Sequence, residues 1–159
     1  MDLIPAEWWF PYLYKILLFA EGGIGDGVHI SHVIALLQLL THLIERCPHR
    51  TTQLMEMVIR IGLDACVFAG RMKANQSSNL IETVNAFWLT VCQLQPMLVC
   101  QYLQCFYTKF DKELGKGTLA IRKEDVYDVR SWLKAEFIQH STHCEVCAEQ
   151  VDKVNQVLS

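Results

Sequence analysis

Apolar residues recur at three- and four-residue intervals along most of the chain. Residues 28–47 (VHISHVIALLQLLTHLIERC) set polar side chains such as Gln38 and His42 among apolar ones at this spacing. That pattern predicts an amphipathic helix with a wide apolar face. Similar patterns predict helices over residues 5–20, 52–74 and 97–114. No alternating run is longer than TLAI, so the pattern leaves little room for a sheet.

The joints between these segments carry residues that begin or end helices. Pro48 is expected to end the helix over 28–47. Asn79 and Glu82 have the spacing of a capping box, which predicts a fourth helix that Pro96 separates from the fifth. A final helical region is expected from residues 123–125 to 158, with a bend near residue 141. The sequence therefore predicts an all-α bundle of about six helices, without a sheet.

The composition fits one helical domain over residues 1–159, either a whole protein or the N-terminal part of a longer one. Hydrophobic residues make up 52% of the chain and charged residues 19%, below the roughly 25% that is average for charged residues. This excludes a disordered chain and leaves apolar surface for a partner. Residues 83–108 are uncharged but are interrupted by polar side chains and Pro96, so we expect no membrane-spanning helix.

The cysteine content indicates a reducing compartment. The chain has seven cysteines, an odd number, and several lie inside apolar helical segments, where a free thiol behaves as a small hydrophobic group. The start, MDLIPAEWW, carries acids where a secretory signal has basic residues. We therefore expect an intracellular location, in the cytoplasm or the nucleus.

Positive charge gathers in the middle of a chain whose net charge is −3. The cluster around the end of the fifth helix comprises Lys109, Lys112, Lys116, Arg122 and Lys123. Such a cluster suits an anionic surface such as lipid headgroups. Lysines near a helix C-terminus also interact favourably with the helix dipole, which is the alternative interpretation. The negative net charge makes nucleic acid a doubtful partner.

The N-terminal segment WWFPYLY is unusually aromatic. Its large side chains are Trp8, Trp9, Phe10, Tyr12 and Tyr14. Packing into the core is the ordinary role of such residues. A contact between copies of the chain is the functional alternative, because Trp and Tyr are frequent anchors of interfaces.

One segment near the C-terminus has the residue types of a zinc site. In QHSTHCEVC the candidate ligands are His140, His143, Cys144 and Cys147. Cys-x-x-Cys is a common zinc half-site, but a second half-site is missing and one helix brings four ligands together poorly. The alternative is that Cys144 and Cys147 are ordinary thiols, and in that case no cofactor is expected. Zinc is the one cofactor that these four residues could bind.

The glycine-rich stretch FAEGGIGDGVHISH does not fit a nucleotide site. A dinucleotide fingerprint requires glycine at residue 28, which is Val28, and Asp26 would repel phosphate. We interpret Gly22 to Gly27 as a mobile hinge between helices. No catalytic motif is found elsewhere, and Asp64 in IGLDACVF is interpreted as the solvated edge of a helix. No enzyme is expected.

Two segments carry a family resemblance: the cysteine-rich apolar helix VCQYLQCFY and the later stretch HCEVCAEQVD. Over residues 97–152 the chain resembles the helical N-terminal domain of orthomyxovirus (influenza-type) matrix proteins. The residues between and after the two cysteines of the second motif, Glu145, Val146 and Ala148, differ from those of the family. The resemblance implies a non-enzymatic coat that polymerises beneath a viral envelope.

Two functions of different classes remain open. The first is a structural, self-associating helical protein, as in a viral matrix, which uses the positive middle segment against anionic membrane. The second is a cellular adaptor, similar to an armadillo or HEAT fragment, that binds a partner protein. The absence of an internal repeat counts against a solenoid.

Overall fold

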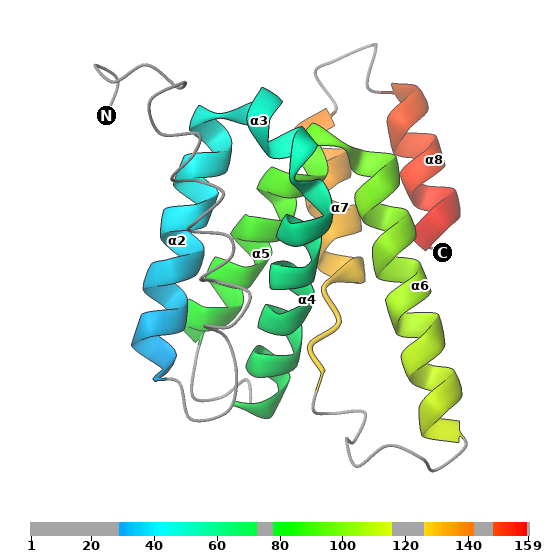
Figure 1. Cartoon of the computed structure of the whole chain (residues 1–159). Coiled ribbons are helices and arrows are strands. Elements are labelled where there is room, and N and C mark those ends of the chain that lie inside the picture. The colour runs from blue at the N-terminus through cyan, green and yellow to red at the C-terminus, as the bar shows by residue number, and fades with distance from the viewer. Residues whose placement is uncertain (1–28, 73–77, 116–125, 142–147, 159) are drawn as a thin grey trace.

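The chain forms an all-α bundle, as the sequence predicts (Figure 1). The computed structural model describes residues 29–72, 78–115, 126–141 and 148–158. These parts contain no strand and seven helices: α2 (Ile30–Arg46), α3 (Pro48–Gln53), α4 (Met55–Arg71), α5 (Ser78–Leu94), α6 (Pro96–Gly115), α7 (Arg130–Ser141) and α8 (Ala148–Leu158). Only α3, with 6 residues, is shorter than 11 residues, so the expected number of about six helices is confirmed.

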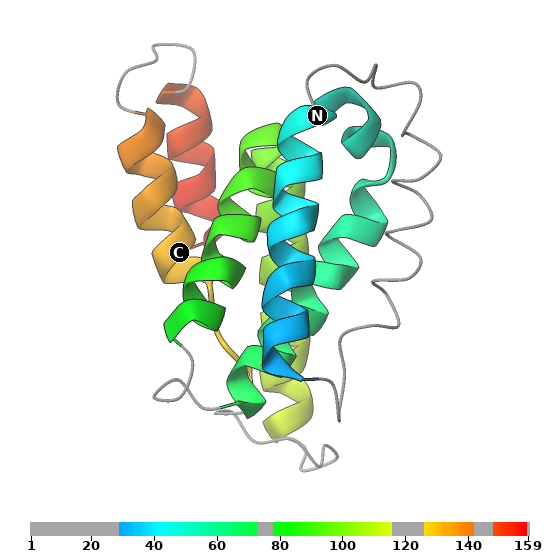
Figure 2. The same cartoon turned by 90° about the vertical axis from the view of Figure 1, so that its left-hand side faces the viewer.

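Helix α5 is the centre of the bundle. It packs against α2, α4, α6 and α7, while α8 lies along α6 and α7 (Figures 1 and 2). Phe87 and Trp88 of α5 are completely buried. The uncharged segment around them therefore contributes to the core. Burial of large apolar side chains is the main stabilising contribution to such a bundle.

Local interactions set both ends of α2, and the N-terminal cap was not expected from the sequence. His29 caps the helix: its Nδ1 accepts a hydrogen bond from the backbone N–H of Ser31 at 3.2 Å. At the other end α2 stops at Arg46, as Pro48 predicts. Pro48 then begins α3, because the first position of a helix needs no N–H donor. Pro96 begins α6 in the same way.

Three expected boundaries are wrong. The single helix expected over residues 52–74 is divided at Leu54 between α3 and α4. Asn79 lies inside α5, which begins at Ser78, so Asn79 does not have the N-cap position of a capping box. The last helical region is not continuous from 123–125, which themselves lie outside the described residues. Residues 126–129 are not helical, and two helices follow, α7 and α8.

The described helices do not include a membrane span: none of them combines the length and the apolar character that crossing a bilayer needs. The helix expected over residues 5–20 and the hinge expected at Gly22 to Gly27 lie outside the described residues.

Candidate functional site: the two faces of α6

Helix α6 has a buried face and an exposed face with different residue types. The buried face carries Val99, Cys100, Leu103 and Tyr107. The exposed face carries Cys105, Thr108, Lys109 and Lys112. The buried face fixes the helix in the bundle, and the exposed face is therefore presented on a rigid support.

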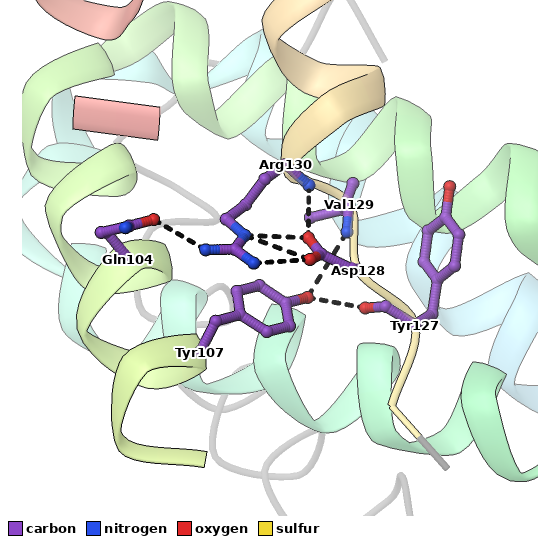
Figure 3. Close-up of polar contacts among 6 residues, drawn as sticks. All are labelled: Gln104, Tyr107, Tyr127, Asp128, Val129 and Arg130. Atoms are coloured by element: carbon purple, nitrogen blue, oxygen red, sulfur yellow. Dashed lines mark hydrogen bonds and ion pairs between the residues drawn. The ribbon is translucent and has the colours of Figure 1, made fainter. Parts of the chain in front are cut away.

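Tyr107 connects α6 to the extended residues before α7 (Figure 3). Its hydroxyl donates a hydrogen bond to the carbonyl oxygen of Tyr127 at 2.6 Å. The same oxygen accepts a hydrogen bond from the backbone N–H of Val129 at 3.4 Å. Burial raises the pKa of Tyr107, so the hydroxyl stays protonated and keeps its donor.

Arg130 extends this network across the ring of Tyr107. Its guanidinium forms a two-pronged contact with Asp128, with Nε–Oδ1 at 3.0 Å and Nη2–Oδ2 at 2.7 Å. Nη1 donates to Oε1 of Gln104 at 2.8 Å, and Cζ lies 4.5 Å from the centre of the Tyr107 ring. The hydrogen bonds with Asp128 raise the pKa of Arg130. Planar Arg–carboxylate pairs and cation–π contacts of this kind fix geometry as well as adding stability.

Tyr127 attaches the same extended residues to two further helices. Its backbone N–H donates to the carbonyl of Cys66 in α4 at 3.0 Å, and its hydroxyl donates to Oδ1 of Asn85 in α5 at 2.9 Å. Residues 126–129 are therefore held by α4, α5 and α6 together. These contacts explain why the chain is extended here, where the sequence predicted a helix. The network satisfies its own polar groups, and its role is to hold α6 and α7 in place.

The exposed face of α6 brings together two of the five basic residues that the sequence singled out. Lys109 and Lys112 line an open hollow of about 350 Å³ with Gln104, Cys105 and Thr108. These positions share one side of the helix because residues three and four apart are neighbours. Lys116, Arg122 and Lys123 lie outside the described residues. Of the five basic residues, the structure therefore shows the positions of Lys109 and Lys112, which both lie on the exposed face of α6.

A second open groove lies between α2 and α5, and the sequence analysis did not propose it. It has a volume of about 400 Å³ and is lined by Gln38, Thr41, His42, Glu45, Glu82, Thr83 and Ala86. Its described lining contains two carboxylates and neither lysine nor arginine. The polar residues of α2 at positions 38, 41, 42 and 45 share one side of the helix, which was the available signal. Their pairing with α5 required the tertiary fold.

The remaining candidates are located only in part. His143, Cys144 and Cys147 lie outside the described residues, as does the side chain of His140. Within the described residues, no three His, Cys, Asp or Glu side chains gather as metal ligands. The aromatic residues proposed for self-association, Trp8, Trp9, Phe10, Tyr12 and Tyr14, also lie outside them.

The described cysteines are free thiols and most of them belong to the core. Cys47, Cys66, Cys92 and Cys100 are buried, whereas Cys105 is exposed. Burial raises the pKa of Cys66 to about 12. The pKa of Cys92 is also raised, by its hydrogen bond with Cys100 and by burial. The thiols of Cys66 and Cys92 therefore stay neutral, and the four buried cysteines pack as small hydrophobic groups, as expected.

Comparison with family models, with curated proteins and with solved structures finds no match for this chain. The resemblance to matrix proteins therefore stays a prediction, and the function has to be argued from the site. Asp64 is exposed on α4, in agreement with its interpretation as a solvated helix edge.

Proposed function

We propose that this chain is a non-enzymatic structural protein that self-associates and uses the exposed face of α6 to contact an anionic surface. The observation that carries the proposal is the position of Lys109 and Lys112. Both are exposed, and both line the same hollow on a helix whose opposite face is buried. Such a surface presents charge in a fixed direction, which suits docking.

The strength of the contact favours an assembly over a single molecule. A lysine near an anionic surface contributes about 1 kcal/mol, so the two lysines together contribute about 2 kcal/mol. That is too little to hold one copy in place. Many copies joined together raise the total affinity without a new type of contact. Self-association would therefore strengthen the contact with the anionic surface.

Within this proposal, the resemblance over residues 97–152 suggests a matrix layer beneath a viral envelope. The buried free thiols Cys47, Cys66, Cys92 and Cys100 suit a reducing compartment. In that case the anionic surface is either the membrane or another protein of the layer.

The test measures assembly by light scattering and lipid binding by co-sedimentation with anionic and neutral vesicles. The double variant Lys109→Gln, Lys112→Gln should lower assembly or anionic-vesicle binding by at least tenfold, since about 2 kcal/mol is lost. The matched control is Arg60→Gln, Lys153→Gln, which removes the same charge from exposed positions on α4 and α8. A wild-type chain that stays monomeric and ignores anionic vesicles would refute the proposal.

A second candidate is the adaptor function, and the α2–α5 groove is the observation that favours it. Glu45 and Glu82 on its lining would attract a basic segment of another protein. A chain that remains monomeric but binds lysine-rich peptides, with affinity lost in Glu45→Gln, Glu82→Gln, would support this function instead.

A further inference from the structure

We propose that the anionic surface contacted by α6 is the α2–α5 groove of a second copy of this chain. The proposal rests on the self-association argued above and names its two surfaces. One is the basic face, defined by Lys109 and Lys112. The other is the acidic groove, defined by Glu45 and Glu82. The contact joins unlike surfaces, so each copy can bind two neighbours.

The first argument is charge complementarity. The groove presents exposed carboxylates from both of its walls, Glu45 from α2 and Glu82 from α5. The hydroxyl protons of the two threonines on the lining are already used within the protein. Thr41 and Thr83 each donate to a carbonyl of their own helix at 2.7 Å. The groove therefore offers acceptors to a partner that brings ammonium groups.

The second argument is the access to both surfaces. The hollow lined by Lys109 and Lys112 and the groove lined by Glu45 and Glu82 are both open. The long lysine side chains of one copy can therefore reach the carboxylates of another. Lysine stems also add apolar contact beneath their charged ends.

The third argument is the position of the exposed apolar side chains. Leu39 and Tyr102, with 44% and 39% of their surface exposed, are the large hydrophobic residues exposed in the described part of the chain. Leu39 lies three residues before His42 of the acidic groove, so the two side chains are neighbours on α2. Tyr102 lies two turns before Lys109 on the same side of α6. Each surface therefore has an apolar residue beside it. Tyrosine is a frequent anchor at interfaces.

The two surfaces lie on opposite sides of the bundle. Helix α2 lies at the left and α6 toward the right in Figure 1, and α2 lies in front of α6 in Figure 2, which is turned by 90°. A copy cannot fill its own groove with its own α6. A contact between unlike surfaces builds rings or open chains, whereas a symmetric contact would stop at a dimer.

Charge reversal tests the contact directly. The groove variant is Glu45→Lys, Glu82→Lys, and the face variant is Lys109→Glu, Lys112→Glu. Each variant alone places like charges opposite each other, so its self-association by light scattering should fall by about tenfold or more. An equimolar mixture of the two should recover assembly, because every groove then finds a face of opposite charge. A chain carrying all four reversals should also assemble.

Controls separate this contact from general effects of charge and folding. Glu56→Lys, Asp152→Lys has the charge change of the groove variant at exposed positions on α4 and α8, and it should assemble as the wild type does. Helical circular dichroism and a cooperative melting transition verify that each variant is folded.

Every other outcome contradicts a specific part of the proposal. If the single variants assemble as well as the wild type, or the mixture fails to recover, the contact is wrong while self-association stands. If the face variant loses only its binding to anionic vesicles, the surface is a lipid and the inference is wrong. A wild-type chain that is monomeric at every concentration refutes both this inference and the self-association on which it rests.

Discussion

Gly62 allows α4 and α5 to approach closely at the centre of the core. A Cβ atom at this position would lie 2.5 Å from Cζ2 and 2.8 Å from Cε2 of Trp88, and 3.0 Å from Cε1 of Phe87. Both rings are completely buried, so they have little room to move. Glycine is used here for space, despite its cost in a helix.

Gly62→Ala should therefore destabilise the protein. Alanine improves helix propensity by about 1 kcal/mol, but overpacking a filled core costs about 1–3 kcal/mol. We expect the overpacking to exceed the gain and the free energy of unfolding to fall by about 1 kcal/mol. The urea midpoint should shift down with an unchanged slope. Gly70→Ala, at a half-buried position of the same helix, is the control. A Gly62→Ala variant as stable as the wild type would contradict the close packing.

At the scale of elements, the hydroxyl of Tyr107 joins α6 to the residues that lead into α7. Tyr107→Phe removes the donor to Tyr127 and leaves the buried N–H of Val129 without that acceptor. An unsatisfied buried group costs about 1–3 kcal/mol, so we expect a loss of about 2 kcal/mol in the free energy of unfolding. Amide exchange should also increase at residues 127–130.

Tyr102→Phe is the matched control, since this tyrosine is exposed on the same helix. It should leave stability and exchange unchanged. Equal effects of the two substitutions would show that the Tyr107 hydroxyl does not hold the segment.

The helices themselves were largely predictable, because they depend on local patterns. The apolar spacing of residues 28–47 and the position of Pro96 gave α2 and the start of α6 correctly. The extended residues 126–129 were not predictable, because distant groups hold them. Cys66, Asn85 and Tyr107 lie on three different helices. The same reason explains why Lys109 and Lys112 could be found as neighbours on one helix, while the acidic groove needed α2 and α5 to pack together.

At the scale of the whole molecule, a contact between unlike surfaces predicts how assemblies end. The face variant, Lys109→Glu, Lys112→Glu, keeps a native acidic groove. It can therefore accept the α6 face of a wild-type copy, but its own face cannot enter another native groove. Each variant molecule should end a chain, so the mean mass of a wild-type assembly should fall steadily as the variant fraction rises at constant total concentration.

The groove variant, Glu45→Lys, Glu82→Lys, should end chains at the opposite end with similar potency. Light scattering on defined mixtures measures both effects. Raising the salt concentration should shorten wild-type assemblies too, because the charges at the contact are exposed and are screened over about 8 Å at physiological ionic strength. A symmetric contact behaves differently: its assemblies stop at a dimer, and their mass does not grow with wild-type concentration beyond twice that of one chain. Mass that grows with concentration, and that either variant reduces, therefore distinguishes head-to-tail assembly from a symmetric dimer.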